Sequence, residues 1–270
     1  YTVEGAPCPN DLATVNITFV SPPFSGFASN QEICINDYIG GNTFNLNTLL
    51  TNADAGGVWS YNGSVIPAQI NPSTYGDGVY QFDYEVFGIA PCNDMTTSVS
   101  LTINPEPVVG SFTTNIPVVA QGFDVDVIVD MTIGSPPFTA TVVDDEVPSN
   151  NYTINVNPPN MSGLVNVIPN NIPITTYTLT GIVDGKGCST TSNLTTQVIV
   201  DPYPYIDPFT TSTAVICEGD NASISVVLQL GEAPIVVDYS YNGNNYTYNL
   251  GSIGQITPIS ATIPIDISGL

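Results

Sequence analysis

The chain is most unusual in what it lacks. Among its 270 residues there is no histidine and no arginine, and Lys186 is its single basic side chain, against 24 aspartates and glutamates. The formal net charge of −23 excludes a basic patch that could displace counterions from phosphates, so we expect neither nucleic-acid binding nor attraction to anionic membranes. Without histidine a serine or cysteine nucleophile has no ordinary base, so we do not expect an enzyme.

Long apolar runs and helical patterns are missing as well. No stretch of about 18 apolar residues occurs, so we expect no membrane insertion by a helix. The first residues lack the basic start of a signal peptide, so the sequence reads as a mature chain or a fragment. Hydrophobic residues still make up 42% of the chain, enough for two or three domain cores.

Period-2 alternation is abundant, and it recurs along the chain. The stretch from Tyr1 matches the stretch from Tyr84, with a Pro-Cys pair ending at Cys8 in one and at Cys92 in the other. A weaker third copy reaches Cys188, so the intervals are 84 (92 − 8) and 96 (188 − 92) residues. Periods of this size predict tandem β-sandwiches. The first copy continues in alternating residues that predict a strand: Val15, Ile17 and Phe19.

Sequence patterns typical of β-hairpins recur at matching places and support the same division into repeats. The sequence from Trp59 to Gly63 and that from Tyr239 to Gly243 both run from a strand into Asn-Gly, and Thr139–Val143 is the matching strand before a turn at Asp144–Asp145. Proline clusters then divide the chain into a truncated domain (1–24), two full domains (25–106 and 107–202) and an incomplete one (203–270). Proline-rich links act as semi-rigid spacers, so we predict an all-β, antiparallel, extended rod.

Several motifs resemble the tandem immunoglobulin-like and PKD-like repeats of giant Bacteroidota surface proteins, which are exported by the type 9 system and include gliding-motility adhesins. They are "GGVWS" at 56–60, "GDGVYQFDYEV" at 76–86, "GSPPFTA" at 134–140 and "VICEGD" at 215–220. The resemblance implies immunoglobulin-like sandwiches in a long filament displayed on the cell surface, where single repeats are commonly spacers and the whole binds polysaccharide or solid surfaces.

The five cysteines suit disulfides in an oxidising, extracellular setting, although all five could be reduced. Cys34 could bond Cys92 within one domain, or Cys8 could bond Cys34 and Cys188 bond Cys217 across boundaries. In an immunoglobulin-like sandwich the last loop lies where the first strand enters, which places the late cysteine near the start of its own domain. We therefore predict Cys34–Cys92 and leave Cys8, Cys188 and Cys217 unpaired within the chain.

Excess carboxylate is suited to calcium, which takes oxygen ligands. The weak candidates are Asp144, Asp145 and Glu146, or Asp201 and Asp207 beside a link, although solvated acidic turns are the simpler explanation. Trp59 is expected to be a core residue, and cross-strand packing explains the tyrosines at 239, 241, 246 and 248 without a sugar ligand. No catalytic residue and no cofactor is predicted.

The leading hypothesis is therefore a repeat segment of a bacterial surface filament or adhesin, extracellular, serving as spacer and display rod. Its partners would be neighbouring repeats and possibly polysaccharide or another surface. Two alternatives stay open: a carbohydrate-binding accessory module of a secreted polysaccharide-degrading enzyme, or a pilus-like subunit completed by a strand from a neighbour.

Overall fold

The computed structural model describes residues 2–5, 8–207, 210–211, 215, 217, 222–231, 234–241, 243–251 and 259–265, without the side chains of 2–12, 210–211, 230, 241 and 265. All regular elements in these residues are β-strands or short 3-10 turns, and none of them is a helix long and apolar enough to cross a membrane. The chain divides into two compact units, Tyr1–Glu106 and Pro107–Leu270.

The first unit holds an antiparallel hairpin of β1 (Thr2–Gly5) and β2 (Cys8–Leu12), and a β-sandwich. One sheet of the sandwich has the order β4-β11-β10-β7-β8, and the strand pairs β3-β6 and β5-β9 complete it. Its elements are β3 (Phe27–Ala28), β4 (Gln31–Cys34), η1 (Ile35–Tyr38), β5 (Phe44–Asn45), η2 (Leu46–Leu49), β6 (Leu50–Thr51), β7 (Val58–Tyr61), β8 (Ser64–Ile66), β9 (Gln69–Ile70), η3 (Pro72–Thr74), β10 (Gly78–Val86) and β11 (Met95–Asn104).

Alternation builds this sheet as predicted. On β10 the side chains of Phe82, Tyr84 and Val86 are buried while their neighbours face outward. The β7–β8 hairpin turns at Asn62 and Gly63, whose φ angles of 48° and 77° are both positive, the geometry that Asn-Gly turns favour. The core therefore lies on the face of the sheet that carries these three β10 side chains together with Trp59 of β7.

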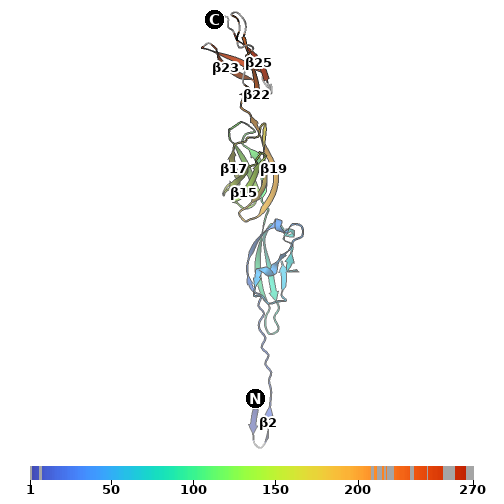
Figure 1. The fold of residues 1–270 in the computed structure, drawn as a ribbon. Coiled ribbons are helices and arrows are strands. Elements are labelled where there is room, and N and C mark those ends of the chain that lie inside the picture. Colours follow the sequence, from blue (N-terminus) through green and yellow to red (C-terminus); the bar gives the residue numbers. More distant parts are fainter. Residues whose placement is uncertain are drawn as a thin grey trace. The chain divides into compact units, whose positions relative to one another are not determined.

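The second unit begins with a fuller sandwich, in which the sheet β12-β14-β17 packs on the sheet β13-β19-β18-β15-β16 (Figure 1). The strands are β12 (Val108–Thr114), β13 (Val118–Ala120), β14 (Val125–Ile133), β15 (Phe138–Asp144), β16 (Asn151–Val156), β17 (Ser162–Val167), β18 (Ile174–Val183) and β19 (Ser189–Asp201). The predicted strand at Thr139–Val143 lies within β15, so that prediction is confirmed.

Two strand pairs depart from the antiparallel prediction. β4 runs parallel to β11, and β13 runs parallel to β19. In each sandwich an early strand thus runs alongside the last strand in the same direction, so its end lies at the end of the last strand. This direction decides where the early cysteine lies.

A further group of strands follows in the second unit. β22 pairs with β20, β21 and β25, while β23 pairs with β24. The strands are β20 (Tyr205–Ile206), β21 (Thr210–Thr211), β22 (Ala222–Leu230), β23 (Ile235–Tyr241), β24 (Asn244–Leu250) and β25 (Ile259–Ile265). Val226, Leu228, Leu250, Ile259 and Ile263 form its buried core. We call this group the last sandwich.

The predicted strand at Val15–Phe19 is wrong. No strand is assigned between Leu12 and Phe27, and the side chains of Val15, Ile17 and Phe19 are 81%, 73% and 92% exposed. Alternation alone does not make a strand, because backbone hydrogen bonds need a neighbouring strand.

Candidate functional site

The acidic turn at Asp144–Glu146 follows the end of β15, and its carboxylates face hydrogen-bond donors of the protein itself. Asp144 is only 5% exposed. Its Oδ1 accepts a hydrogen bond from the backbone N–H of Asn150 at 2.7 Å, and its Oδ2 accepts from the Tyr152 hydroxyl at 2.8 Å. A buried carboxylate needs such donors in place of water. Asp144 therefore fixes the loop between β15 and β16.

The neighbouring carboxylates are occupied in the same way. Asp145 Oδ1 accepts from the backbone N–H of Thr176 at 2.9 Å and from the Asn171 side-chain amide at 2.8 Å. Burial alone would raise the pKa of Asp145, but these hydrogen bonds outweigh it and lower the pKa below its ordinary value. Glu146 Oε1 accepts from the backbone N–H of Asn170 at 2.7 Å. A cation bound here would compete with these donors for the carboxylate oxygens.

The second pair of predicted calcium ligands flanks a proline-rich link. Asp201 ends β19, where its carbonyl accepts from the backbone N–H of Gln121 at 2.8 Å. The Asp207 carboxylate instead accepts from the side-chain amide of Gln229. Among the described residues, no group of three acidic, cysteine or histidine side chains is placed to hold a metal ion. Calcium binding stays a prediction.

The predicted Cys34–Cys92 disulfide is wrong. Cys34 is disulfide-bonded, whereas Cys92 is a half-buried free thiol whose Sγ donates to the Val20 carbonyl at 3.6 Å. The parallel register places Cys34 beside Asn104, at the end of β11, while Cys92 precedes Met95 at its start. Ten residues of strand separate those ends by roughly 30 Å, far beyond the limit of about 7 Å for a disulfide. The loop between β10 and β11, which carries Cys92, does lie at the end where the chain enters the sandwich. Cys34 lies at the opposite end, beside the end of β11.

Cys188 is also wrongly predicted, because it is disulfide-bonded and fully buried rather than a lone thiol. Cys217 is an exposed free thiol, which excludes the alternative Cys188–Cys217 bond. The turn before Cys188 is organised by Asp184, whose Oδ1 accepts from the backbone N–H groups of Lys186 and Cys188, each at 2.9 Å. Asp184 Oδ2 accepts from the backbone N–H of Ser135 at 3.0 Å. The side chain of Cys8 lies outside the described residues.

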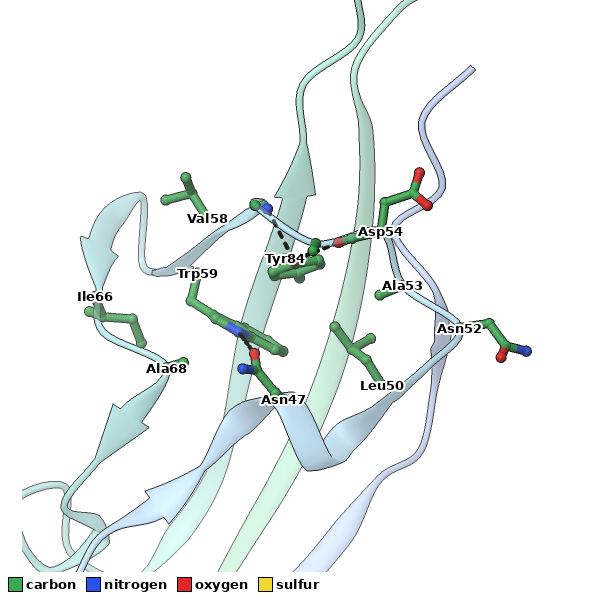
Figure 2. Close-up of a pocket in the computed structure, with 13 residues that line it drawn as sticks. Asn47, Leu50, Asn52, Ala53, Asp54, Val58, Trp59, Ile66, Ala68 and Tyr84 are labelled. Atoms are coloured by element: carbon green, nitrogen blue, oxygen red, sulfur yellow. Dashed lines mark hydrogen bonds between the residues drawn. The ribbon is translucent and has the colours of Figure 1, made fainter. Parts of the chain in front are cut away.

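A pocket of about 540 Å³ opens in the first sandwich beside Trp59 (Figure 2). Trp59 is 3% exposed, which confirms its predicted place in the core. Its Nε1–H donates to Asn47 Oδ1 at 2.8 Å, and its ring centroid lies 5.0 Å from that of Tyr84. The indole thus forms part of the pocket wall while its polar atom is satisfied by η2.

The rim of the pocket is a loop held by Tyr84. The Tyr84 hydroxyl donates to the Asp54 carbonyl at 2.9 Å and accepts from the Gly57 backbone N–H at 3.0 Å, as Figure 2 shows. A Cβ on Gly57 would lie 2.5 Å from the Tyr84 ring, so only glycine fits there. The carboxylate of Asp54 is engaged by the backbone N–H of Phe24 at 2.8 Å. The lining therefore supplies apolar contact and amide hydrogen bonds rather than acid–base chemistry.

Sequence reasoning found the tryptophan of this pocket but not the pocket. The partners of Trp59 and Tyr84 are Asn47 and the 54–57 loop, 12 and 27 to 30 residues away, and no sequence spacing marks them. The "GGVWS" run was the one usable signal, since a glycine next to a buried strand indicates close packing.

Two tyrosines of the β23–β24 hairpin, Tyr239 and Tyr246, pack on each other as expected, and the side chain of Tyr241 lies outside the described residues. Tyr239 lies opposite Tyr246, and their rings stack with centroids 5.4 Å apart. Tyr248 lies opposite Val237. The arrangement is that of a cross-strand aromatic pair, which needs no ligand to explain it.

No protein-family model and no curated protein matches the sequence. Among solved structures, the chain is similar to the titin domains I67–I69 in a glutamate-to-alanine variant, with a TM-score of 0.44, 11% identity and coverage of 79% of each chain. A tetra-tandem repeat from the extending region of a large adhesion protein gives a TM-score of 0.31 at 15% identity, over 79% of this chain and 58% of that one. Domains 1–6 of the surface layer protein SbsC give 0.27 at 13% identity, over 79% of this chain and 31% of that one.

Proposed function

We propose that the chain is a repeat segment of a long extracellular bacterial surface filament or adhesin, in which it acts as a structural spacer and display rod. The observation that carries this proposal is a link geometry that recurs. Gly134, with φ of 116°, approaches Pro107 just before β12, and Gly231, with φ of 107°, approaches Pro204 just before β20. A Cβ on either glycine would lie 3.2 Å from the Cα of its proline. The same close contact at the entry of successive sandwiches marks a repeated unit.

The link after β19 is also held against its sandwich. The backbone N–H of Tyr203 donates to Gln121 Oε1 at 3.2 Å, and a Cβ on Gly122 would lie 3.3 Å from the Tyr203 hydroxyl. Pro202 and Pro204 fix their own φ angles on either side. A link restrained in this way transmits orientation from one domain to the next, which suits a spacer.

Cysteine chemistry supports an extracellular location. Cys34 and Cys188 are disulfide-bonded, and disulfides persist mainly outside the cytoplasm. Together with the resemblance to type 9-secreted repeats, this supports display on a bacterial cell surface, with gliding motility as one setting. The partners proposed are neighbouring repeats and a polysaccharide or other surface. The division into 1–24, 25–106, 107–202 and 203–270 remains part of this proposal.

One observation favours the alternative of a carbohydrate-binding module, namely the Trp59 pocket with its amide rim. A glycan array probed with the full chain tests it, and Asn52→Gly is the matched variant, because it removes the side chain of a lining residue and tolerates the positive φ of 59° at that position. Specific glycan binding lost in that variant would favour the module, whereas no binding leaves the spacer role as proposed.

Surface display is tested with antibodies raised against residues 25–202. We expect them to label intact cells of the source organism and expect brief external protease treatment to remove the label. Labelling that appears only after the cells are permeabilised would contradict the proposal.

A further inference from the structure

The pocket beside Trp59 has aliphatic walls. They are formed by partly buried side chains of the first sandwich: Leu50, Ala53, Ile66 and Ala68. Figure 2 shows these side chains on both sides of the Trp59 indole, with the Asn47 amide directed at the indole nitrogen. The volume of about 540 Å³ lies within the range of about 300–1,000 Å³ that small-molecule sites occupy.

Two polar side chains of the lining are already engaged. The Tyr84 hydroxyl both donates and accepts a hydrogen bond, and the Asp54 carboxylate accepts from the backbone N–H of Phe24. A ligand hydroxyl buried against the aliphatic walls would lose its water without gaining a partner, which costs free energy. The deeper part of the pocket therefore favours an apolar group over a hydroxyl group.

Asn47 supplies a hydrogen-bond donor in the same place. The indole Nε1–H of Trp59 can only donate, so the Asn47 atom that faces it at 2.8 Å is the carbonyl oxygen Oδ1. The orientation of the amide is thereby fixed, and its Nδ2 donates to no other group in the described part of the chain. Asn47 is exposed, so a ligand can reach these N–H groups. The site combines an amide donor with apolar walls.

Charge restricts the ligand further. Lys186 is the single basic residue of the chain and does not line the pocket, and the formal net charge is −23. A carboxylate, sulfate or phosphate group on the ligand would therefore be repelled. Figure 2 shows the carboxylate of Asp54, the acidic residue of the lining, directed away from Trp59, so a cationic group gains no partner beside the indole. The pocket is suited to an uncharged ligand.

We infer that the pocket binds the acetamido group of an N-acetylated amino sugar. This group joins a methyl, which the aliphatic walls cover, to a carbonyl oxygen, which accepts a hydrogen bond from Asn47 Nδ2. The sugar ring lies at the mouth of the pocket, where its hydroxyls keep water as their partner. A plain hexose has a hydroxyl in place of the acetamido group and cannot use the walls. The inference rests on the proposed contact with polysaccharide and names the class of sugar that the contact recognises.

The fluorescence of Trp59 tests the inference, because it is the single tryptophan of the sequence and lies in the pocket wall. The full chain is titrated with tri-N-acetylchitotriose and with cellotriose, which has hydroxyls where the first sugar has acetamido groups. We expect a saturable change with the acetylated sugar and an affinity at least about 10-fold lower for cellotriose. Equal affinities would overturn the inference and leave carbohydrate binding in place. If neither sugar binds, the inference and a sugar site at this pocket both fail, whereas the spacer role is tested separately by scattering.

Asn47→Asp tests the donor by isothermal titration calorimetry. It keeps an oxygen for the Trp59 Nε1–H but replaces the Nδ2 donor by an acceptor, so binding of the acetylated sugar should weaken at least about 10-fold. The matched control is Asn62→Asp, which adds the same charge to an exposed residue outside the lining, in a turn that also accepts Asp-Gly. It should bind like the natural chain.

Ala68→Leu is a second variant that does not depend on the Asn47 hydrogen bond. Its larger side chain fills space between the aliphatic walls, so it should also weaken binding of the acetylated sugar. Thermal unfolding of each variant shows whether the first sandwich is still folded. Binding that survives both Asn47→Asp and Ala68→Leu would place the sugar elsewhere and overturn the inference.

Discussion

Two tyrosines on adjacent parts of one sheet differ in a single hydrogen bond. The Tyr152 hydroxyl donates to the buried carboxylate of Asp144, whereas the Tyr177 hydroxyl is buried without a hydrogen-bond partner in the described part of the chain. Burial raises the pKa of both phenols, and the hydrogen bond to Asp144 adds to the rise at Tyr152. The Tyr152 hydroxyl should therefore stabilise the folded state, whereas the buried Tyr177 hydroxyl should destabilise it.

Replacing each tyrosine by phenylalanine separates these effects. Tyr177→Phe removes an unsatisfied polar group and should leave the free energy of unfolding unchanged or raise it by up to about 1 kcal/mol. Tyr152→Phe takes a donor from a buried carboxylate and should lower it by about 1.5–3 kcal/mol. Thermal unfolding of the two variants side by side measures the difference, and equal losses would contradict this description of the core.

Asp130 on β14 predicts a pH dependence. Hydrogen bonds from Ser111 on β12 and Ser162 on β17 lower the pKa of Asp130. A carboxyl whose pKa is lower in the folded state contributes stability above its unfolded value near 3.9, and this contribution is lost as the pH falls through the folded value. Ser111→Ala should raise the pKa of Asp130 toward its ordinary value in an NMR titration of the carboxyl carbon. An unchanged titration would show that the Ser111 bond is absent in solution.

At the scale of single elements, the close contact between Gly134 and the strand that follows it fixes the entry of a sandwich. A Cβ on Gly134 would lie 2.6 Å from the Phe138 ring as well as near Pro107. Gly134→Ala therefore adds a clash, worth about 1–3 kcal/mol, to the strain of a positive φ, which costs about 1–2 kcal/mol.

Gly187→Ala is the matched control, because Gly187 also has a positive φ of 82° but has no atom within 4 Å of the added Cβ. We expect the melting temperature to fall clearly more for Gly134→Ala than for Gly187→Ala. An equal fall would mean that the contact at the link is loose, and would weaken the evidence for a repeated link.

Whether a feature could be predicted from the sequence depends on how far apart in the chain its interacting residues lie. β10, β14 and β15 were predictable because alternation is local, and the turn at Asn62–Gly63 because its backbone geometry selects its residues. The prediction of a strand at Val15–Phe19 was wrong because strand pairing depends on a partner distant in the sequence. The Cys34–Cys92 pairing failed because the direction of β4 relative to β11 has no local signal. The Trp59 pocket was missed for the same reason, since its rim comes from remote loops.

At the scale of the whole molecule, the oxidation state of the cysteines is a direct check. Alkylation of the denatured chain without reductant should modify Cys92 and Cys217, which are free thiols, and leave Cys34 and Cys188 unmodified. Peptide mass spectrometry reads each site, and the reduced chain provides the control in which all are modified. If Cys92 were protected from alkylation together with Cys34, the result would contradict this assignment and favour a Cys34–Cys92 disulfide.

The spacer role depends on the links holding successive sandwiches apart, and small-angle X-ray scattering of the chain measures this most directly. Strands of ten to thirteen residues span roughly 35–40 Å, so three sandwiches in line should give a radius of gyration above about 30 Å. A compact globule of this length would give about 18 Å. In a dilution series extrapolated to the monomer, a value above about 30 Å supports the spacer, and a value near 18 Å would contradict it.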